Sequence, residues 1–236
     1  MCAFSNPAIE RTSAYCTSNG KLVFRSGSSL KQTDNVANVG EIVYERQTSV
    51  RRYDATYWSM PVEKAGFQMY NLSPLTLFDK YFHLNTTGTA SAWEIIYNGK
   101  KDMLTGYGYS IRAPQTVSLT DRENFTAVFT GVPNNGNYNV NVAPGKWNLI
   151  GNPYPSALSA DLLLKENPML NGTLYFWTHN TPAKPVASNQ YSADDYASFN
   201  LTGGTAARSD VDYGSGGGVK PTGEIAAGQS FFLTTK

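Results

Sequence analysis

The sequence predicts an all-β protein, an antiparallel β-sandwich of jelly-roll type that is built from two related halves. Aromatic residues make up 13% of the chain and include 15 Tyr, whereas charged residues make up 16%, compared with about 25% in an average soluble domain. Aromatic and β-branched residues favour pleated faces, and the 21 Gly and 12 Pro are typical of many short turns. An internal repeat, described below, predicts two similar halves.

The balance of charges excludes several classes of partner. The chain of 236 residues has 19 Lys+Arg and 18 Asp+Glu, a formal net charge of +1, so it has no strong field to hold nucleic acid or an anionic membrane. No apolar run approaches the roughly 18 residues that a membrane-spanning helix requires, and no charged segment followed by an apolar stretch begins at Met1. We therefore expect a soluble chain with no nucleic-acid partner and no membrane insertion.

Residues 1–50 form a separate N-terminal segment of short alternating runs. Turns rich in Gly, Ser and Asn separate these runs, which is the pattern of closely spaced strands. The strands are either an edge hairpin of the main domain or the end of a β-solenoid that continues upstream. Cys2 and Cys16 either pair with each other in an oxidising compartment or leave one cysteine for an upstream partner. The three runs lie at 21–25, 29–32 and 41–45.

Residues 51–236 contain the repeat, with halves at 51–130 and 131–236. Each half has a Trp strand that ends in Pro, a middle Tyr-Phe strand, and a closing strand that begins with Gly. The first half has 48 residues from Trp58 to Gly106, and the second has 81 from Trp147 to Gly228, so the second half carries an insertion. Because Trp58 and Trp147 recur at equivalent places, we expect both to pack in a core.

The insertion is a long loop at about 181–222 with the most unusual composition in the chain. It contains the Gly-rich strings NLTGG and GSGGG, and long loops of this kind are often functional. A short helix is predicted at 161–165 with Ser159 as its N-cap. A smaller counterpart is predicted at 73–78 in the first half.

Catalytic signatures are missing from the sequence. It has no common hydrolase or nucleotide-binding motif, so we expect a protein that is not an enzyme. For His83 and His179, which follow the Tyr-Phe strands, a structural role outweighs a metal or catalytic one. A glycoside hydrolase needs two acids about 5–9 Å apart in space. Glu94 and the pair Asp194-Asp195, each beside an aromatic residue, therefore leave a glycosidase as a third alternative.

Acidic residues in the inserted loop suggest calcium as the one cofactor to consider. Oxygen ligands suit this hard cation, and a bound ion would order a Gly-rich segment. The spacing of these acids fits no calcium-binding loop motif, so a solvated loop is the alternative. The candidate ligands are Asp194, Asp195, Asp210 and Asp212.

Four aromatic residues lie outside the repeat and are the candidates for ligand binding. A sugar ring stacks on an aromatic plane while amide side chains bind its hydroxyl groups, and this chain is rich in both aromatic and amide residues. The alternative for each of the four is a place in the core. They are Trp93, Trp177, Tyr191 and Tyr196.

Several strings in the chain occur together in one group of proteins. Examples are WNLIGNPYPS at 147–156 and GTLYFWTHN at 172–180, and others lie at 42–46, 51–62, 108–114, 129–136, 195–204 and 225–232. Together they closely resemble a region near the C-terminus of large secreted or cell-surface proteins of Flavobacteria and other Bacteroidetes. In those proteins the region usually lies just upstream of a type IX secretion sorting domain. The resemblance covers about residues 20–236 and implies an extracellular or cell-surface location and no catalytic residues.

Together these observations predict a non-catalytic module of an exported cell-surface protein. We expect it to serve as a structural spacer or an adhesion platform. The alternative is a carbohydrate-binding module that uses the four aromatic residues and a calcium-ordered loop. The expected partners are other domains of the same secreted protein, and glycans or surface proteins.

Overall fold

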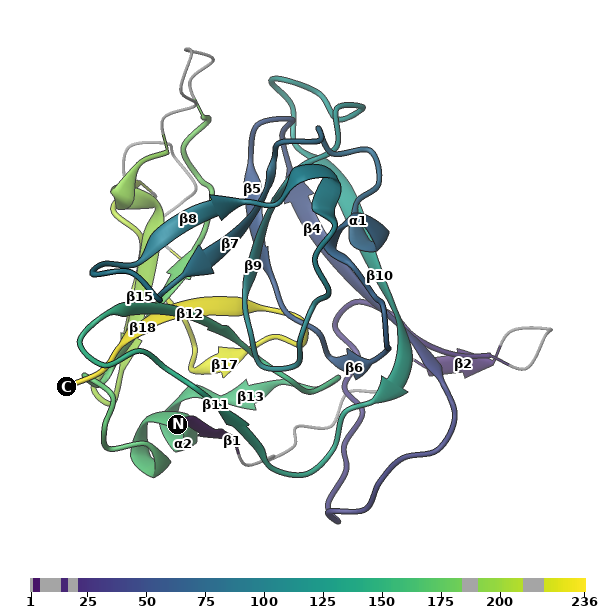
Figure 1. The fold of residues 1–236 in the computed structure, drawn as a ribbon, viewed down its shortest axis with the longest axis vertical. Coiled ribbons are helices and arrows are strands. Elements are labelled where there is room, and N and C mark those ends of the chain that lie inside the picture. The colour runs from purple at the N-terminus through teal and green to yellow at the C-terminus, as the bar shows by residue number, and fades with distance from the viewer. Residues whose placement is uncertain (1, 5–13, 17–20, 184–190, 210–218) are drawn as a thin grey trace.

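The computed structural model describes residues 2–4, 14–16, 21–183, 191–209 and 219–236, and it is an all-β sandwich, as predicted (Figure 1). Three larger sheets dominate. The first has the order β2 (Ala14–Cys16), β3 (Leu22–Phe24), β4 (Ile42–Val50), β10 (Glu123–Pro133) and β6 (Val62–Glu63). The second has the order β5 (Ala55–Trp58), β9 (Tyr109–Arg112), β7 (Tyr81–Asn85) and β8 (Ala92–Ile95). The third has the order β12 (Trp147–Gly151), β18 (Ser230–Thr234), β14 (Thr173–Trp177), β15 (Tyr196–Asn200) and β16 (Gly203–Thr205).

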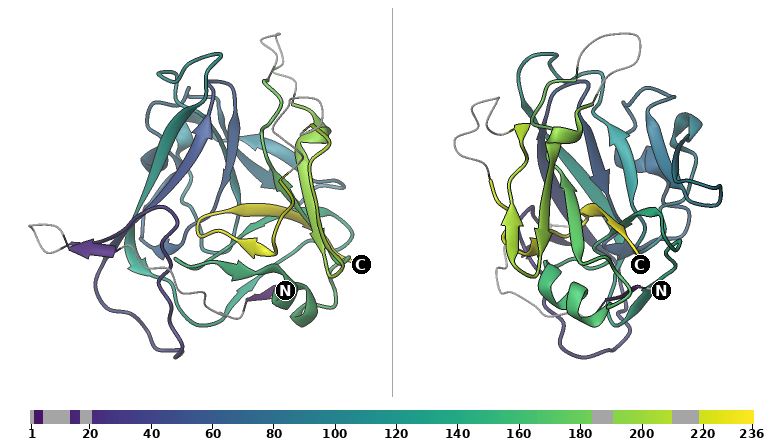
Figure 2. Two further views of the ribbon diagram at one scale, coloured as in Figure 1. Left: turned by 180° about the vertical axis from the view of Figure 1, so that it is seen from behind. Right: turned by 90° about the vertical axis from the view of Figure 1, so that its left-hand side faces the viewer.

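Smaller elements complete the fold (Figure 2). They are the two-stranded pairs β1 (Cys2–Phe4) with β11 (Tyr138–Val140) and β13 (Leu158–Ser159) with β17 (Glu224–Ile225), the helices α1 (Met69–Leu72) and α2 (Ala160–Glu166), and the 3-10 turns η1 (Tyr97–Gly99) and η2 (Ala193–Asp195). Cys2 and Cys16 lie in β1 and β2, which belong to different sheets. No helix among the described residues is long and apolar enough to cross a membrane.

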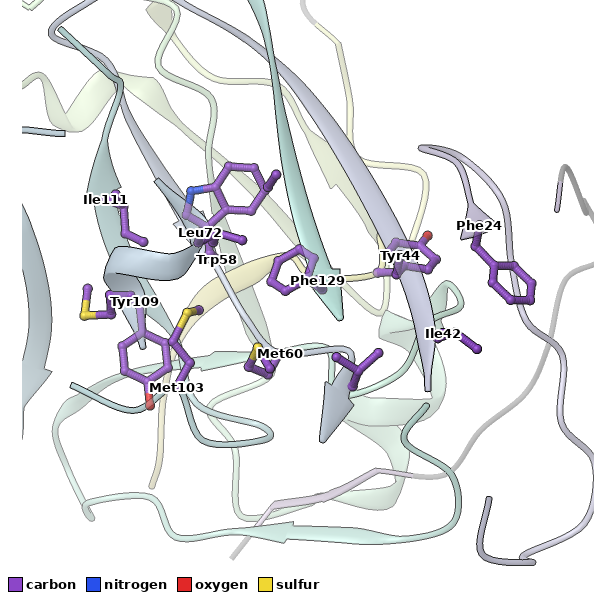
Figure 3. Close-up of a cluster of buried hydrophobic side chains, with 14 of the residues drawn as sticks. Phe24, Ile42, Tyr44, Trp58, Met60, Leu72, Met103, Tyr109, Ile111 and Phe129 are labelled. Carbon is purple, nitrogen blue, oxygen red and sulfur yellow. The ribbon is translucent and has the colours of Figure 1, made fainter. Parts of the chain in front are cut away.

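Two apolar cores hold the sheets. The first core lies between the β4–β10 sheet and the β5–β9–β7 sheet, and Figure 3 shows Trp58 and Tyr109 from one side and Tyr44 and Phe129 from the other. Trp58 is 1% exposed and Phe129 is fully buried. The second core lies behind the β12–β18–β14–β15 sheet, where α2 and the β13–β17 pair cover it.

The N-terminal strands include the one parallel pair among the described strands. β3 lies parallel to β4 with Leu22 opposite Ile42, as successive rungs of a solenoid would. The antiparallel strand β2 occupies the other edge of β3, so among the described strands the parallel stacking is limited to β3 and β4. The run at 29–32, which was predicted as a strand, is not one. It is held instead by a hydrogen bond from the Leu30 N–H to the Pro155 carbonyl, with Ser29 buried.

The second and third sheets repeat one arrangement of strands. In each, the Trp strand pairs with the closing strand, the closing strand with the Tyr-Phe strand, and the Tyr-Phe strand with the next strand along the chain: β5-β9-β7-β8 and β12-β18-β14-β15. The expected boundary at 130/131 falls inside the continuous strand β10. The segment 181–222 is not a loop throughout, because it contains β15 and β16. The extra residues of the second half therefore lie between β14 and β15 and after β16.

The prediction that Trp147 packs in a core like Trp58 is wrong. Trp58 pairs with Tyr109 across β5 and β9, and the residue that pairs with Phe231, the counterpart of Tyr109, is Ile150. Ile150 is 1% exposed, whereas the Trp147 side chain is 47% exposed. Trp58 and Ile150 occupy equivalent positions, and each lies three residues before a proline, Pro61 or Pro153.

The two sheets join through reciprocal main-chain contacts. The Ser59 N–H donates to the Gly228 carbonyl at 2.9 Å, and the Gly151 N–H donates to the Gly106 carbonyl at 3.0 Å. Trp58 likewise bridges to Gln229 as Ile150 bridges to Tyr107. In the register above, Ser59 corresponds to Gly151 and Gly106 to Gly228, so each half makes the same contact with the other.

Close packing at this junction explains why one of the two equivalent positions is glycine. A Cβ atom on Gly151 would lie 2.1 Å from the Cβ of Ser59, which no real pair of atoms tolerates. The Ser59 hydroxyl donates to the Asn152 carbonyl at 2.8 Å. The space between the halves holds the Ser59 side chain, and a second side chain at position 151 would overlap it.

The helices follow local sequence rules. Ser159 is the N-cap of α2, and its hydroxyl accepts from the Leu162 N–H, as predicted. The prediction of a helix at 73–78 is wrong, because α1 spans Met69–Leu72 and residues 73–78 are not helical. Pro74 disfavours a helical conformation at Ser73, so α1 ends there. Ser73 is therefore the C-cap of α1.

Gly151→Ser should lower the free energy of unfolding by roughly 1–3 kcal/mol, the usual cost of overpacking a filled site. Adding Ser59→Gly moves the hydroxyl to the other half and should recover most of the loss. Urea unfolding of the wild type, the two single variants and the double variant measures both effects. A single Gly151→Ser variant as stable as the wild type would contradict the packing described here.

Candidate functional site

Strand alternation divides aromatic side chains between the second core and the opposite face of the third sheet. In β14, Leu174 and Phe176 point into the core, so Tyr175 and Trp177 point to the other face. In β18, Phe231 and Leu233 are core residues, whereas Phe232 lies on the opposite face and packs against residues from β5 and β7. The second and third sheets therefore share one surface.

We call this surface the aromatic face. Its centre is Tyr57, whose ring centroid lies 5.8 Å from that of Trp93, 5.9 Å from that of Trp177 and 5.6 Å from that of Phe232. Further ring contacts extend the cluster in both directions across the face. Its members are Tyr57, Phe82, Trp93, Trp147, Tyr175, Trp177, Tyr191, Tyr196 and Phe232.

All four predicted binding residues lie on the aromatic face. Trp93 is 43% exposed and Tyr191 is 42% exposed, while Trp177 and Tyr196 are half-buried. Trp177 contacts both Tyr191 and Tyr196, with ring centroids at 5.8 Å and 5.0 Å. The structure thus brings residues from β8, β14 and β15 together on one surface.

Sequence reasoning missed Trp147, Tyr175, Tyr57 and Phe232. Trp147 was assigned to the core, yet it lies at the outer end of β12 and contacts Tyr175 with ring centroids at 5.1 Å. The signal that could have found Tyr175 is the alternation of β14, where every second side chain leaves the core.

Two adjacent hollows open on the aromatic face. One has a volume of about 350 Å³ and includes Trp177, Tyr57 and Tyr191 in its lining, and we call it the Trp177 hollow. The other has a volume of about 520 Å³ and includes Trp147, Tyr175 and Phe232, and we call it the Trp147 hollow. Trp93 and Tyr196 line both.

The lining of both hollows is uncharged. It consists of aromatic rings, small apolar residues and serines, with no Asp, Glu, Lys or Arg among the described residues. Burial raises the pKa of Tyr191 and of Tyr196 to about 12, and burial raises the pKa of Tyr57 well above its usual value. The phenols therefore stay neutral at physiological pH and act as hydrogen-bonding groups.

Hydrogen bonds hold the rings of the Trp177 hollow in place. The Trp177 indole N–H donates to the Ala55 carbonyl at 2.9 Å, and the Tyr191 hydroxyl donates to the Tyr53 carbonyl at 2.8 Å. The hydroxyls of Tyr57 and Tyr196 lie 2.7 Å apart in a hydrogen bond. Fixed rings of this kind bind with little loss of side-chain entropy.

Asp195 secures the connection between β14 and β15, which carries Tyr191. Its side chain is fully buried, and its Oδ1 accepts from the Thr181 N–H at 2.9 Å and from the Thr181 hydroxyl at 2.8 Å. Its Oδ2 is buried without a hydrogen-bond partner among the described residues. Asp194 lies 3.5 Å from the guanidinium of Arg208.

Of the four candidate calcium ligands, Asp195 has a buried carboxylate oxygen without a hydrogen-bond partner among the described residues. Asp210 and Asp212 lie outside the described residues. Within the described part of the chain, no group of three or more His, Cys, Asp or Glu side chains is close enough together to hold a metal ion. Calcium binding by this loop stays a prediction.

The two histidines and Glu94 lie outside the lining of both hollows. His83 lies 3.9 Å from Glu94, and burial lowers the pKa of His83. His179 is held by its carbonyl, which accepts from the guanidinium groups of Arg51 and Arg122, both at 2.9 Å. Neither histidine lines either hollow of the aromatic face.

A third hollow of about 600 Å³ lies near the first sheet and is different in character. Arg46 and Glu224 both line it, along with a run of serines at 26–29. The Arg46 guanidinium donates to the Gly228 carbonyl at 2.7 Å and lies 4.9 Å from the centre of the Trp58 ring. These contacts give Arg46 a structural role at the junction of the two sheets.

The fold and this face define an all-β sandwich that carries an extended aromatic surface with two uncharged hollows. The chain belongs to a family described as a domain of unknown function (DUF8693), whose match covers residues 8–236. Searches of curated proteins and of solved structures found no match. The family description names no catalytic activity.

The half-buried His179 should make the protein less stable in acid. Burial, reinforced by Arg122, Arg51 and Arg46, lowers the pKa of His179 to about 3, whereas an exposed histidine in the unfolded chain has a pKa of about 6.5. The unfolded state therefore binds the proton first, and the stabilising contribution, fully present above pH 6.5, is lost as the pH falls towards 3.

The variant His179→Asn should show a shallower loss of unfolding free energy between pH 6.5 and pH 4. The slope for one group approaches about 1.4 kcal/mol per pH unit. Asn suits this position because His179 has φ 44, a left-handed conformation that Asn tolerates. Urea unfolding at several pH values tests this, and identical slopes for both proteins would contradict it.

Proposed function

We propose that this domain is a non-catalytic adhesion module of an exported cell-surface protein and that it binds uncharged glycans on its aromatic face. The observation that carries the proposal is the gathering of Trp93, Trp177, Tyr191 and Tyr196 around two hollows on one surface. A spacer without a ligand gives no reason for this surface, since exposed apolar patches usually mark interaction sites.

The chemistry of the lining favours a sugar over other ligands. Aromatic rings offer flat apolar surfaces, and tyrosine and serine hydroxyls supply hydrogen bonds, which together suit a ligand that is apolar on its faces and polar at its edges. The absence of charged side chains from the described lining disfavours nucleotides, acidic peptides and charged polysaccharides. The net charge of +1 provides no general attraction for such anions either.

Export to the cell surface rests on the motifs at 147–156 and 172–180 and their resemblance to secreted proteins of Bacteroidetes. The second of these motifs forms β14 and supplies Tyr175 and Trp177 to the aromatic face. The same residues that support the resemblance therefore also support the binding proposal. Other domains of the same secreted protein would be its neighbours along the chain.

Binding is tested by retention of the protein on immobilised cellulose, β-glucan, mannan and xylan, followed by calorimetric titration with oligosaccharides of the retained polymer. Trp93→Ala should weaken binding by roughly tenfold or more, equivalent to about 1.4 kcal/mol, because Trp93 lines both hollows. Pectate serves as the charged control and should not retain the protein.

Tyr97→Ala is the matched control variant for this experiment. Tyr97 is 60% exposed and stacks on Phe78 with ring centroids at 6.1 Å, yet it lines neither hollow. Its removal should leave binding unchanged. Equal loss in both variants, or no retention of the wild type on any neutral polysaccharide, would contradict the proposal.

Calcium is proposed to order the connection between β14 and β15 by binding the free oxygen of Asp195. Added calcium should then raise the melting temperature of the wild type through mass action, and a chelator should reverse the change. Asp195→Asn keeps one oxygen acceptor and should respond less to calcium. An unchanged melting curve with excess calcium and with chelator would remove calcium from the mechanism.

A further inference from the structure

The two hollows occupy equivalent places in the two sheets. Trp93 pairs with Leu84 across β8 and β7, and Tyr196 pairs with Trp177 across β15 and β14. Phe82 pairs with Ser110 in the second sheet as Tyr175 pairs with Phe232 in the third. Trp93 and Tyr196 are thus counterparts, and so are Phe82 in the Trp177 hollow and Tyr175 in the Trp147 hollow.

The hollows are neighbours that share their walls. Trp93, Ala193 and Tyr196 line both of them. Trp93 and Tyr196 also both contact Phe232, with ring centroids at 5.9 Å and 6.0 Å, and both contact Tyr57. A ligand unit in one hollow therefore lies directly beside a unit in the other.

The hollows differ in their free hydrogen-bonding groups. In the Trp177 hollow, the polar atoms of Trp177, Tyr191 and Tyr57 already bond within the protein. In the Trp147 hollow, the Trp147 indole N–H and the Tyr175 hydroxyl have no hydrogen-bond partner among the described residues. The Trp147 carbonyl accepts from the Ser91 hydroxyl at 2.6 Å, and the Tyr196 hydroxyl, which belongs to both hollows, is bonded to that of Tyr57.

From this asymmetry we infer that the ligand is a neutral oligosaccharide that spans both hollows, and that the two hollows bind its sugar units by different interactions. The Trp147 hollow binds the hydroxyl groups of one sugar unit through Trp147 and Tyr175. In the Trp177 hollow the next sugar unit stacks on the fixed rings and forms few hydrogen bonds through its hydroxyl groups. This inference rests on the proposed function, and it adds that the ligand is a chain and that Tyr175 determines which sugar is accepted.

A series of oligosaccharides from monosaccharide to hexasaccharide tests the first part. The probes are the cello-, laminari-, manno- and xylo-series, titrated calorimetrically against the wild type. The affinity should rise by roughly tenfold or more, about 1.4 kcal/mol, once the chain is long enough to enter both hollows, and then level off. A monosaccharide that binds as tightly as the hexasaccharide would overturn the two-hollow ligand while leaving glycan binding in place.

Variants of the two hollows test the division of work. Trp177→Ala should reduce the affinity for long chains to that for short ones and leave monosaccharide binding nearly unchanged. Tyr175→Phe removes one hydroxyl without changing the ring and should weaken chains of every length. Tyr97→Phe is its matched control, because Tyr97 is 60% exposed and lines neither hollow.

The outcomes separate the two levels of the proposal. If Tyr175→Phe binds as well as the wild type, or if Tyr97→Phe loses as much affinity as Tyr175→Phe, the assigned roles are overturned. If no series binds the wild type at any length, the proposed function itself fails. Near-ultraviolet circular dichroism of each variant confirms that its aromatic cluster is still packed.

Discussion

The reciprocal hydrogen bonds at Ser59 and Gly151 are the constraint on which the rest of the structure depends. They join the two sheets at the ends of β5, β9, β12 and β18, and each sheet has its own apolar core on one side while the two share a surface on the other. Without this junction, these hydrogen bonds would not hold the outward side chains of the two sheets on one surface. The aromatic face is therefore a product of how the halves meet rather than of either half alone.

Because successive side chains of a strand point to opposite faces, the core residues and the aromatic face lie on opposite sides of the same strands. Adjacent residues such as Phe231 and Phe232 serve opposite sides of the same sheet, one in the second core and one on the aromatic face. Since the cores supply the apolar burial that holds the domain, the outward rings are free to carry a ligand site. The hydrogen bonds of Trp177 and Tyr191 then fix those rings without adding charge.

Features set by nearby residues could be predicted from the sequence, whereas those set by strand register could not. The all-β class and the helix capped by Ser159 could be predicted from composition and local pattern, and the four aromatic candidates chosen from the sequence lie together on one face. The position of Trp147 could not be predicted, because a change of strand register can move a side chain to the other face of a sheet. Matching Trp147 to Trp58 gave the wrong register, since the structural counterpart of Trp58 is Ile150. The role of Asp195 depends on Thr181, a partner far along the chain that no local motif indicates.

The two halves do not present the same side chains to a ligand laid across the aromatic face. Although the halves contact each other reciprocally, the strand register makes Ala55 the counterpart of Trp147 and Leu84 the counterpart of Trp177. An oligosaccharide bound as proposed would therefore meet different side chains at its reducing and its non-reducing end. The hydrogen-bond donors of Trp147 and Tyr175 add to this difference, because their counterparts Ala55 and Phe82 have no polar side-chain group, so the surface would favour one orientation of the bound chain.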